Sequence, residues 1–378
     1  MSLLTSEQND LRNLVSDFAK QKIAPKAAEY DLTEEFPWEN VKQMAELGLL
    51  GLPIPEEYDG GGADTVSYIV AIEEISKACA ATGAIMAVHT SAGTMPILLF
   101  GTEEQKKKYI PDLAVGKKIA AFALTEAGAG SDASQVATTA TLDGDYYVLN
   151  GSKCFITNGI AASTYCIFAT TDKSKGLKGI TGFIVEKDTP GFSFGKKEDK
   201  MGIRASSTAE LIFQDCRIPE KNRLGKIGEG FKIAMIILDS ARIGIGAQAV
   251  GIAQAAYEEA LAYAKVRVQF GKPIAALQAI QFMLADMAIQ IEASRQLVYH
   301  AAELKDAGLP FGKEAAMAKT FASDIAVKVA SDAVQIMGGY GYSREYPVER
   351  IMRDAKITQI YEGTNQIQRV VIAGHILK

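Results

Sequence analysis

The spacing of apolar residues changes twice along this chain of 378 residues, and the change limits its fold more than any other feature. From Leu11 to Phe18, and in later segments of the first third, apolar residues recur at helical intervals. Residues 137–217 instead hold short β-branched runs and turn signals. From about Gly230, long segments rich in Ala, Leu and Ile return. We therefore expect a mostly α-helical protein with a central β-domain.

Local signals place the expected elements. Thr5-x-x-Gln8 and Thr102-x-x-Gln105 are capping-box patterns, which mark helix starts. Asp143-Gly144 predicts a hairpin, and Asn150-Gly151 is a second turn signal. Because no helices separate them, the strands favour a small antiparallel sheet or barrel over a parallel βαβ sheet. The predicted strands are 138–142, 146–149, 165–170, 180–186 and 210–213.

The last part of the chain contains four helix-length segments with short links that are rich in Gly and Pro. Four such helices predict an up-down four-helix bundle. The predicted helices are 233–265, 274–306, 313–337 and 348–377. We place an N-terminal α-helical domain at 1–119, a middle antiparallel β-barrel-like domain at 120–228, and the C-terminal bundle at 229–378.

Charge and cysteine usage exclude several classes of protein. With 40 basic and 45 acidic residues, the net charge of −5 argues against nucleic acid as a partner. The four cysteines are scattered and the three histidines are unpaired, so neither a disulfide scaffold nor a metal site is expected. The first residues lack a signal peptide, and the apolar stretches look too short to span a membrane. We expect a cytoplasmic protein.

Three segments could carry chemistry. Residues 244–249 fit the G-x-G-x-x-A pattern of dinucleotide-binding turns, but they lie inside a helical segment, where close helix packing explains the glycines better. Residues 121–132 combine glycines with Ser, Thr and Asp, which suits either an anionic or ring-shaped ligand or an ordinary polar loop. Glu362 lies between apolar flanks, where partial burial would raise its pKa and make it a usable base.

Taken together, these segments resemble the acyl-CoA dehydrogenase family, and most closely its short-chain, butyryl-CoA-oxidising branch. The resemblance covers the whole chain in the family's order and spacing. It rests on Leu124-Thr125-Glu126 with Ala129-Gly130-Ser131-Asp132, Asn150-Gly151-Ser152-Lys153 with Phe155-Ile156-Thr157-Asn158, Leu238-Asp239 with Arg242, Arg267-x-x-Phe270-Gly271, Gln335-x-x-Gly338-Gly339-Tyr340-Gly341, Met352-Arg353-Asp354-Ala355-Lys356 and Ile360-Tyr361-Glu362-Gly363-Thr364.

The resemblance implies the three-domain fold, bound FAD, a homotetramer in which two subunits touch each flavin, and electron transfer to an electron-transferring flavoprotein. It implies that Glu362 removes the α-proton of an acyl-CoA while hydride leaves the β-carbon for flavin N5, which gives a trans-2-enoyl-CoA. The thioester carbonyl would accept hydrogen bonds from a flavin ribityl hydroxyl and from the Glu362 backbone N–H, donors that stabilise the developing enolate.

Carried over by position, the family's FAD contacts fall on Phe122, Leu124, Thr125, Gly130, Ser131, Phe155, Ile156, Thr157, Thr364 and Gln366. Contacts to the neighbouring subunit's FAD fall on Arg267, Phe270, Gln278, Gln335, Gly338 and Gly339. Contacts to the CoA thioester fall on Ser131, Asp239, Arg242, Tyr361 and Gly363, although Asp239 and Arg242 alone would be read as an i, i+3 helix ion pair. No metal is implied.

Individual residues narrow the choice among the branches of this family. Some relatives carry the base next to Arg242, but Ala241 stands there, so Glu362 is the matching base. Glutaryl-type relatives carry an Arg near Gly83, whereas residues 78–96 contain no Arg or Lys, which disfavours a dicarboxylyl substrate. Many relatives have Trp in place of Phe155 and Pro in place of Ala127. The reverse direction as an enoyl-CoA reductase, a branched, cyclic or aryl-propenoyl substrate, and a nucleic-acid-binding family member stay open as alternatives.

Overall fold

Apart from one short hairpin between two C-terminal helices, helices and strands occupy separate parts of the chain, as the sequence predicts. The structure, a computed structural model, describes residues 4–377. Both predicted capping boxes are present, at Thr5 and Thr102, and each starts a helix. The N-terminal helices are α1 (Ser6–Phe18), α2 (Ala27–Thr33), α3 (Trp38–Glu46), α4 (Thr65–Ala78), α5 (Ala80–Ala87), α6 (Met95–Phe100) and α7 (Glu103–Ala114), with short 3₁₀ and π-helical segments between some of them.

The middle of the chain forms one sheet in the order β6-β7-β3-β2-β4-β5-β8, with β1 beside β4. Most neighbours are antiparallel, but β1 and β2 each pair with β4 in parallel, which the sequence did not indicate. β4 and β5 are buried along nearly their whole length. The strands are β1 (Ala120–Ala123), β2 (Thr139–Asp143), β3 (Tyr146–Thr157), β4 (Thr164–Thr170), β5 (Ile180–Glu186), β6 (Phe192–Lys197), β7 (Thr208–Pro219) and β8 (Arg223–Leu224).

Two turn signals in this sheet had different outcomes. The hairpin at Asp143-Gly144 is confirmed, since β2 and β3 pair across it. The turn expected at Asn150-Gly151 is wrong, because β3 runs through it and pairs with β7 on both sides. The register shifts between Leu149 and Gly151, and Gly151 has φ +142°. Glycine therefore serves a β-bulge here rather than a chain reversal.

The C-terminal part contains α8 (Gly230–Val266), α9 (Gln278–Asp306), α10 (Gly312–Met337), α11 (Val348–Ile357) and α12 (Asn365–Ile376), with a hairpin of β9 (Val268–Gln269) and β10 (Lys272–Pro273) between α8 and α9. The continuous helix predicted over 348–377 is wrong. It breaks at 358–364 because Glu362 and Gly363 have positive φ, which a right-handed helix does not accommodate.

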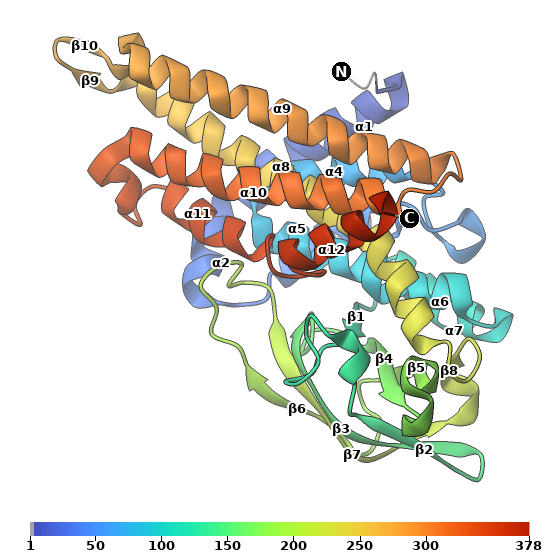
Figure 1. Cartoon of the computed structure of the whole chain (residues 1–378). Helices are drawn as coiled ribbons and strands as arrows, with labels where there is room; N and C mark the ends of the chain where they lie inside the picture. The colour runs from blue at the N-terminus through green and yellow to red at the C-terminus, as the bar shows by residue number, and fades with distance from the viewer. Residues whose placement is uncertain (1–3, 378) are drawn as a thin grey trace.

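Figure 1 shows α8, α9 and α10 running side by side, with α4 and α5 against them and the strands gathered at one end. Gly246 belongs to this helix packing, since a β-carbon there would lie 2.8 Å from a methyl group of Val298. Two helical stretches, Ala80–Phe100 and Gly230–Val266, are long and apolar enough to cross a membrane, contrary to the expectation from sequence. Their most apolar windows are 78% and 72% buried, so both serve as core helices.

Candidate active site

The turn between α11 and α12 carries Glu362 in an uncommon backbone conformation. Glu362 has φ +54° and Gly363 has φ +91°. A left-handed non-glycine residue costs on the order of 1–3 kcal/mol and persists only where its surroundings hold it. The N–H groups of Ile360 and Tyr361 both donate to Ile357 O, so the chain curls tightly before it reaches Glu362.

Side chains from two helices hold this turn. Lys319 Nζ of α10 donates to Gly363 O at 2.8 Å. Gln368 Nε2 of α12 donates to Glu362 O at 3.1 Å and to Gly363 O at 3.0 Å. Lys319 and Gln368 are themselves fully buried. The two carbonyls therefore have fixed partners, and the backbone that carries Glu362 is fixed with them.

The Glu362 carboxyl group lies in surroundings that weaken it as an acid. Its Oε2 atom is buried and has no hydrogen-bond partner among residues 4–377. Burial raises the pKa of Glu362 to about 7, and the nearby cations Arg242 and Lys319 counteract part of that rise. A carboxylate with this pKa is partly ionised near neutral pH and can accept a proton.

Arg242 reaches this turn from α8. Its side chain is 5% exposed and is paired with Asp239, so the i, i+3 ion pair suggested by the sequence is present. Its Nε atom is buried without a hydrogen-bond partner in the described part of the chain. Burial lowers the pKa of Arg242 and raises that of Asp239. A buried cation with an unused N–H next to Glu362 is suited to an anionic or strongly polar ligand.

Tyr361, another predicted substrate residue, has a hydroxyl group that is bonded within the protein. That hydroxyl donates to Gln248 Oε1, and Gln248 Nε2 donates to Ala80 O at 2.9 Å. Burial raises the pKa of the phenol, so it stays protonated. This chain of bonds ties the turn to α8 and α5, which leaves the ring rather than the hydroxyl for a substrate.

A buried ion pair lies under the glycine-rich loop of residues 124–131. Lys153 Nζ donates to Glu126 Oε1 at 2.7 Å and to Leu124 O at 3.1 Å. Glu126 also accepts from the N–H groups of Ala137 and Thr138, at 2.7 and 3.0 Å. Lys153 is 0% and Glu126 is 8% exposed. Burial lowers the pKa of Lys153 to about 8, although the Glu126 carboxylate opposes this.

The same loop lies along β3 and leaves an open surface. Cys154 N donates to Thr125 O at 3.0 Å, so Thr125 lies next to Phe155. Phe155 has φ +56° and is 65% exposed. A β-carbon on Gly128 or Gly130 would meet nothing within 4 Å. An outward-facing aromatic side chain beside open glycines fits a flat ring with an anionic tail, as in FAD.

The structure distinguishes the predicted cofactor residues by what each can offer. Leu124 and Ile156 are buried in the core, so only their backbone can meet a ligand. The Phe122 ring packs against Phe168 at 5.0 Å between centroids. Others are at least partly accessible, namely Thr125, Gly130, Ser131, Phe155, Thr157, Thr364 and Gln366. Thr364 also caps α12, since its hydroxyl accepts from the Ile367 N–H at 3.3 Å.

The remaining predicted residues lie at the opposite end of the bundle. Arg242 and Arg267 are 25 residues apart along α8, a span of roughly 38 Å in a helix. The Arg267 guanidinium lies over the Tyr340 ring at 5.2 Å. Phe270, on the projecting β9–β10 loop at the upper left of Figure 1, is 89% exposed with φ +53°. This second cluster contains Arg267, Phe270, Gln278, Gln335, Gly338 and Gly339, all exposed or half-buried.

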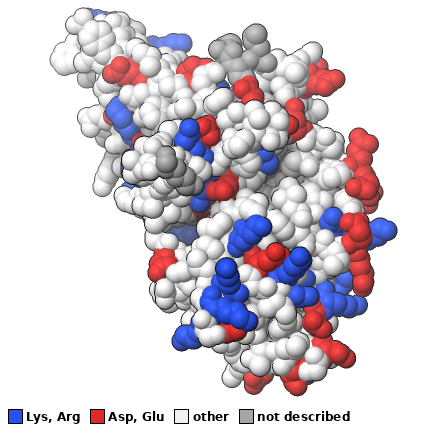
Figure 2. All heavy atoms as spheres, turned by 45° about the vertical axis from the view of Figure 1, so that its right-hand side comes forward, with Lys and Arg blue, Asp and Glu red and all other residues white. Residues whose placement is uncertain are grey.

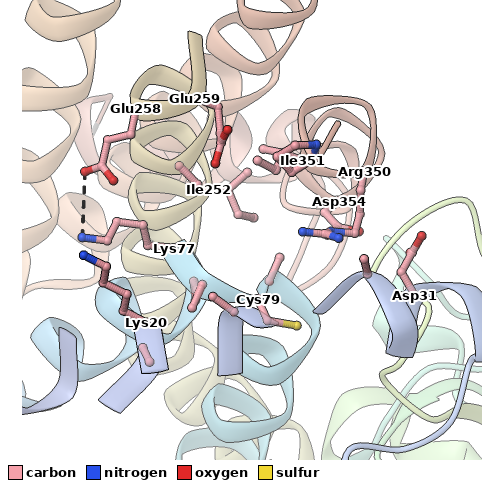
Figure 3. Close-up of a pocket in the computed structure, with 18 of the residues that line it drawn as sticks. Lys20, Asp31, Lys77, Cys79, Ile252, Glu258, Glu259, Arg350, Ile351 and Asp354 are labelled. Atoms are coloured by element: carbon pink, nitrogen blue, oxygen red, sulfur yellow. Dashed lines mark ion pairs between the residues drawn. The ribbon is translucent and has the colours of Figure 1, made fainter. Parts of the chain in front are cut away.

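A cavity of about 960 Å³ lies apart from Glu362, between the N-terminal helices, α8 and α11. Figure 3 shows Lys20 and Lys77 on one side, with Lys77 paired to Glu258, and Arg350 and Asp354 on the other. The cavity belongs to none of the predicted sites.

Surface charge is mixed on the face drawn in Figure 2. Lys and Arg gather over the strand-rich end with acidic residues among them, so no continuous stripe of positive or negative charge crosses this face.

No metal site was expected, and within residues 4–377 no group of three His, Cys, Asp or Glu side chains could hold a metal ion. His89 illustrates the structural role expected for the histidines. It is fully buried, with Nε2 at 3.0 Å from Leu113 O and Nδ1 accepting from the Ala120 N–H at 3.0 Å.

Sequence reasoning missed the residues that support the turn and the loop. Lys153 and Glu126 stood inside recognised motifs without an assigned role, and Lys319, Gln368 and Gln248 were not singled out. A lysine within the apolar pattern of a helix, as at Lys319, is the signal that could have found one of them, because lysine is rarely buried without a partner.

Family models match three consecutive parts of the chain. They are the acyl-CoA dehydrogenase N-terminal domain over residues 5–117, the middle domain over 121–216 and the C-terminal domain over 228–377. Among relatives, an acyl-CoA dehydrogenase of Bacillus subtilis (strain 168) is 60% identical and a short-chain specific acyl-CoA dehydrogenase of Clostridium acetobutylicum 54%, each over 99% of both chains. An acryloyl-CoA reductase (NADH) of Anaerotignum propionicum is 54% identical over 99% of this chain and 95% of its own.

Solved structures agree with these matches. Butyryl-CoA dehydrogenase from Megasphaera elsdenii has a TM-score of 0.98 and 53% identity, with all of both chains covered. A chain in a structure of the electron transferring flavoprotein of Acidaminococcus fermentans has a TM-score of 0.99 and 54% identity, again over all of both chains. An acyl-CoA dehydrogenase complexed with FAD from Bacillus anthracis has a TM-score of 0.93 and 40% identity over 99% of this chain and 67% of its own.

Proposed function

Because the chain belongs to the acyl-CoA dehydrogenase family, we propose that it is an FAD-dependent short-chain acyl-CoA dehydrogenase that converts butyryl-CoA-like substrates to trans-2-enoyl-CoA. The observation that carries the proposal is Glu362, a carboxylate held in a left-handed turn, with its pKa raised to about 7, beside the buried cations Arg242 and Lys319. The short-chain relatives, at 53–54% identity over full length, support the substrate class.

Glu362 acts as the general base. Its carboxylate takes the α-proton of the acyl group, and the electron pair of that C–H bond becomes part of the new C=C bond. The Glu362 backbone N–H donates to the thioester carbonyl and so stabilises the negative charge that develops on its oxygen. When bound, FAD would supply the two-electron acceptor, at its N5 atom, for the hydride that leaves the β-carbon. Asp239, Arg242 and Ser131, with Tyr361 and Gly363 of the turn, hold the CoA thioester.

FAD would lie along the glycine-rich loop and β3. Phe122, Leu124, Thr125, Gly130 and Ser131 line one side, and Phe155, Ile156 and Thr157 another, while Thr364 and Gln366 lie beside the base. The exposed Phe155 ring and the open space at Gly130 support this placement. Leu124 and Ile156 contribute through their backbone, because their side chains are buried.

The second cluster, from Arg267 to Gly339, would contact the FAD of a neighbouring subunit. Its distance from Glu362 along the bundle and the exposure of Phe270 favour a partner over the chain's own flavin. We therefore propose a homotetramer in which each flavin meets two subunits. Light scattering of the purified protein distinguishes a tetramer from a dimer.

Electrons would leave to an electron-transferring flavoprotein, a proposal supported by the likeness to a chain in the Acidaminococcus fermentans structure. The opposite direction, reduction of an enoyl-CoA, is the second candidate function, supported by the relative that is an acryloyl-CoA reductase.

We also propose domain boundaries near residues 119 and 228. The free cysteines suit a reducing, cytoplasmic location.

The residue at position 83 bears on which acyl groups the site can bind. Gly83 has no side chain that could bind a distal carboxylate, and a β-carbon there would lie 2.0 Å from Ser76 Oγ, so a larger side chain would displace the Ser76 hydroxyl group. This supports a substrate without a distal carboxylate. A branched or cyclic acyl chain is a variation of the same chemistry.

Product analysis tests the proposed function. The purified protein with FAD, mixed anaerobically with butyryl-CoA, should lose its yellow colour and form trans-2-butenoyl-CoA, which is two hydrogens lighter by mass spectrometry. An unchanged acyl-CoA recovered from a protein that holds FAD would contradict the proposal.

The pH dependence follows from the raised pKa of Glu362. The base must be ionised to take a proton, so kcat/KM should rise as the pH increases through about 7 and level off above it. With an ordinary exposed glutamate as the base, the rise in kcat/KM would occur more than two pH units lower. Initial rates with butyryl-CoA over a pH series check this, and a flat profile between mildly acidic and neutral pH would contradict it.

Gly363→Ala should displace the base. An added β-carbon would lie 2.5 Å from Gln368 Nε2, and alanine adopts positive φ only at a cost. We expect FAD to be retained and kcat to fall by about tenfold to a hundredfold. Gly374→Ala in the exposed part of α12, where a β-carbon meets nothing within 4 Å, is the matched control and should leave kcat unchanged.

A further inference from the structure

Lys319 is a lysine in a place where lysine is rarely found. It lies in the first third of α10, its side chain has no exposed surface, and the ammonium group donates to Gly363 O at 2.8 Å and to Asn365 Oδ1 at 2.9 Å. Both acceptors are neutral oxygens. A buried ammonium group costs free energy unless an anion compensates it, and the two hydrogen bonds alone could be made by a neutral amide.

Asn365 extends this contact into a network between α10 and the start of α12. Its Nδ2 atom donates to Asp324 Oδ1 at 2.7 Å and to Ser323 Oγ at 2.9 Å, both on α10. The N–H of Asn365 donates to Gln359 O at 3.0 Å and closes the turn. The turn that contains Glu362 is thus fixed to a single stretch of α10, residues 319–324, with Lys319 at one end of it.

The charged and titratable groups around Glu362 show that its carboxylate is the anion that the Lys319 ammonium group compensates. Arg242 of α8 faces Glu362 but is already paired with Asp239. Tyr68 of α4 and Tyr361 are neutral phenols whose ionisation Glu362 opposes.

On the α10 side, Asp324 is paired with Arg369 of α12 at 2.9 Å. The hydrogen bonds of Lys319 all go to neutral groups. Burial lowers the pKa of Lys319 to about 7, the negative charge of Glu362 opposes that fall, and the protonated lysine in turn favours the charged form of Glu362. Its hydrogen bond to Gly363 O places it beside the residue that follows the base in sequence.

We propose that Lys319 is a positioning residue for Glu362, which holds the left-handed turn from α10 and whose positive charge keeps the carboxylate ionised and ready to accept a proton. The role rests on the proposed function of Glu362 as the base. It assigns two effects to one side chain, and the two can be separated by substitution.

Three substitutions separate them. Lys319→Met removes both the hydrogen bonds and the charge, Lys319→Gln retains a donor without the charge, and Lys319→Arg retains the charge. Lys328→Met is the matched control, because Lys328 is an exposed lysine on the same helix whose ion pair is with Asp332. Circular dichroism and the flavin spectrum establish that each variant folds and binds FAD.

The readout that does not depend on turnover is the infrared C=O band of protonated Glu362, identified as the band that Glu362→Gln removes. Its titration midpoint should shift upward by about one pH unit in Lys319→Met and Lys319→Gln, since loss of a nearby cation disfavours the carboxylate. Lys319→Arg and Lys328→Met should titrate as the unmodified protein does.

In kinetics, the acidic limb of kcat/KM should move upward with that midpoint, so the two neutral variants lose about tenfold at mildly acidic pH. Lys319→Met alone should also lower kcat on the plateau, because only it loses the hydrogen bond to the turn. Neutral variants that titrate Glu362 as the unmodified protein does, or that do not fold at all, would overturn the proposal in favour of a purely structural lysine. A shifted infrared titration in a protein that butyryl-CoA does not reduce would refute the proposed function and leave the coupling of Lys319 to Glu362 intact.

Discussion

Glu362→Gln is expected to retain FAD and to lose the reaction with butyryl-CoA by about a thousandfold or more, near the upper end of what a general base contributes. Glutamine has almost the same shape and fits the same turn, because Lys319 and Gln368 bind the backbone carbonyls of Glu362 and Gly363 rather than the side chain. The amide cannot take a proton from the α-carbon. Anaerobic rapid mixing, followed at the flavin absorbance, measures the loss.

The control for this substitution is Glu104→Gln on the exposed surface of α7, where the side chain is 74% exposed. It should bind FAD and react as the unmodified protein does. If Glu362→Gln holds FAD and bleaches within tenfold of the unmodified rate, another group removes the proton. Ala241 cannot replace it, since alanine carries no basic group.

Lys153→Met should destabilise the middle of the protein and release FAD. It leaves the Glu126 carboxylate buried without its cation, and breaking a buried pair in this way costs about 3–5 kcal/mol. The loop of residues 124–131 loses the contact between Lys153 Nζ and Leu124 O as well. Thermal unfolding should occur at a lower temperature, and the protein should be purified with less flavin.

A second substitution shows whether the loss comes from the unpaired charge. Glu126→Gln in the Lys153→Met background removes the charge and keeps an oxygen that can accept from the Ala137 or Thr138 N–H. The double variant should recover part of the stability. A double variant as unstable as Lys153→Met alone would mean that packing, rather than charge, sets the cost. Lys175→Met, an exposed lysine paired with Asp172, is the surface control and should change stability little.

Local signals in the sequence predicted the start of α1 and α7 and the hairpin between β2 and β3, because a capping box or an Asp-Gly turn needs only neighbouring residues. The break between α11 and α12 was not predicted. Apolar residues keep their helical spacing through it, and the left-handed conformation of Glu362 is supported by Lys319, from a helix that ends 25 residues before Glu362. Gly151 misled for a similar reason, since pairing with β7 decided between a turn and a bulge.

The candidate site divides in the same way. Glu362 and the loop of residues 124–131 could be named from motifs that are contiguous in sequence. The residues that support them could not be named from sequence, because Lys153 is 27 residues from Glu126 and Gln248 is 113 residues from Tyr361. Such pairs form only when each domain folds and brings distant parts of its sequence together. The sequence also did not show that Leu124 and Ile156 are buried, so that any contact to a cofactor must pass through their backbone.

The central proposal is that Glu362 and FAD together dehydrogenate a short-chain acyl-CoA, and one measurement tests it most directly. The FAD-loaded protein is mixed anaerobically in a rapid-mixing instrument with butyryl-CoA, octanoyl-CoA or dodecanoyl-CoA, and the flavin absorbance is followed through a single turnover. We predict complete bleaching with butyryl-CoA at the highest ratio of rate to half-saturating concentration, with that ratio falling as the chain lengthens. A flavin that stays oxidised with all three, or that dodecanoyl-CoA reduces most efficiently, would contradict the proposal.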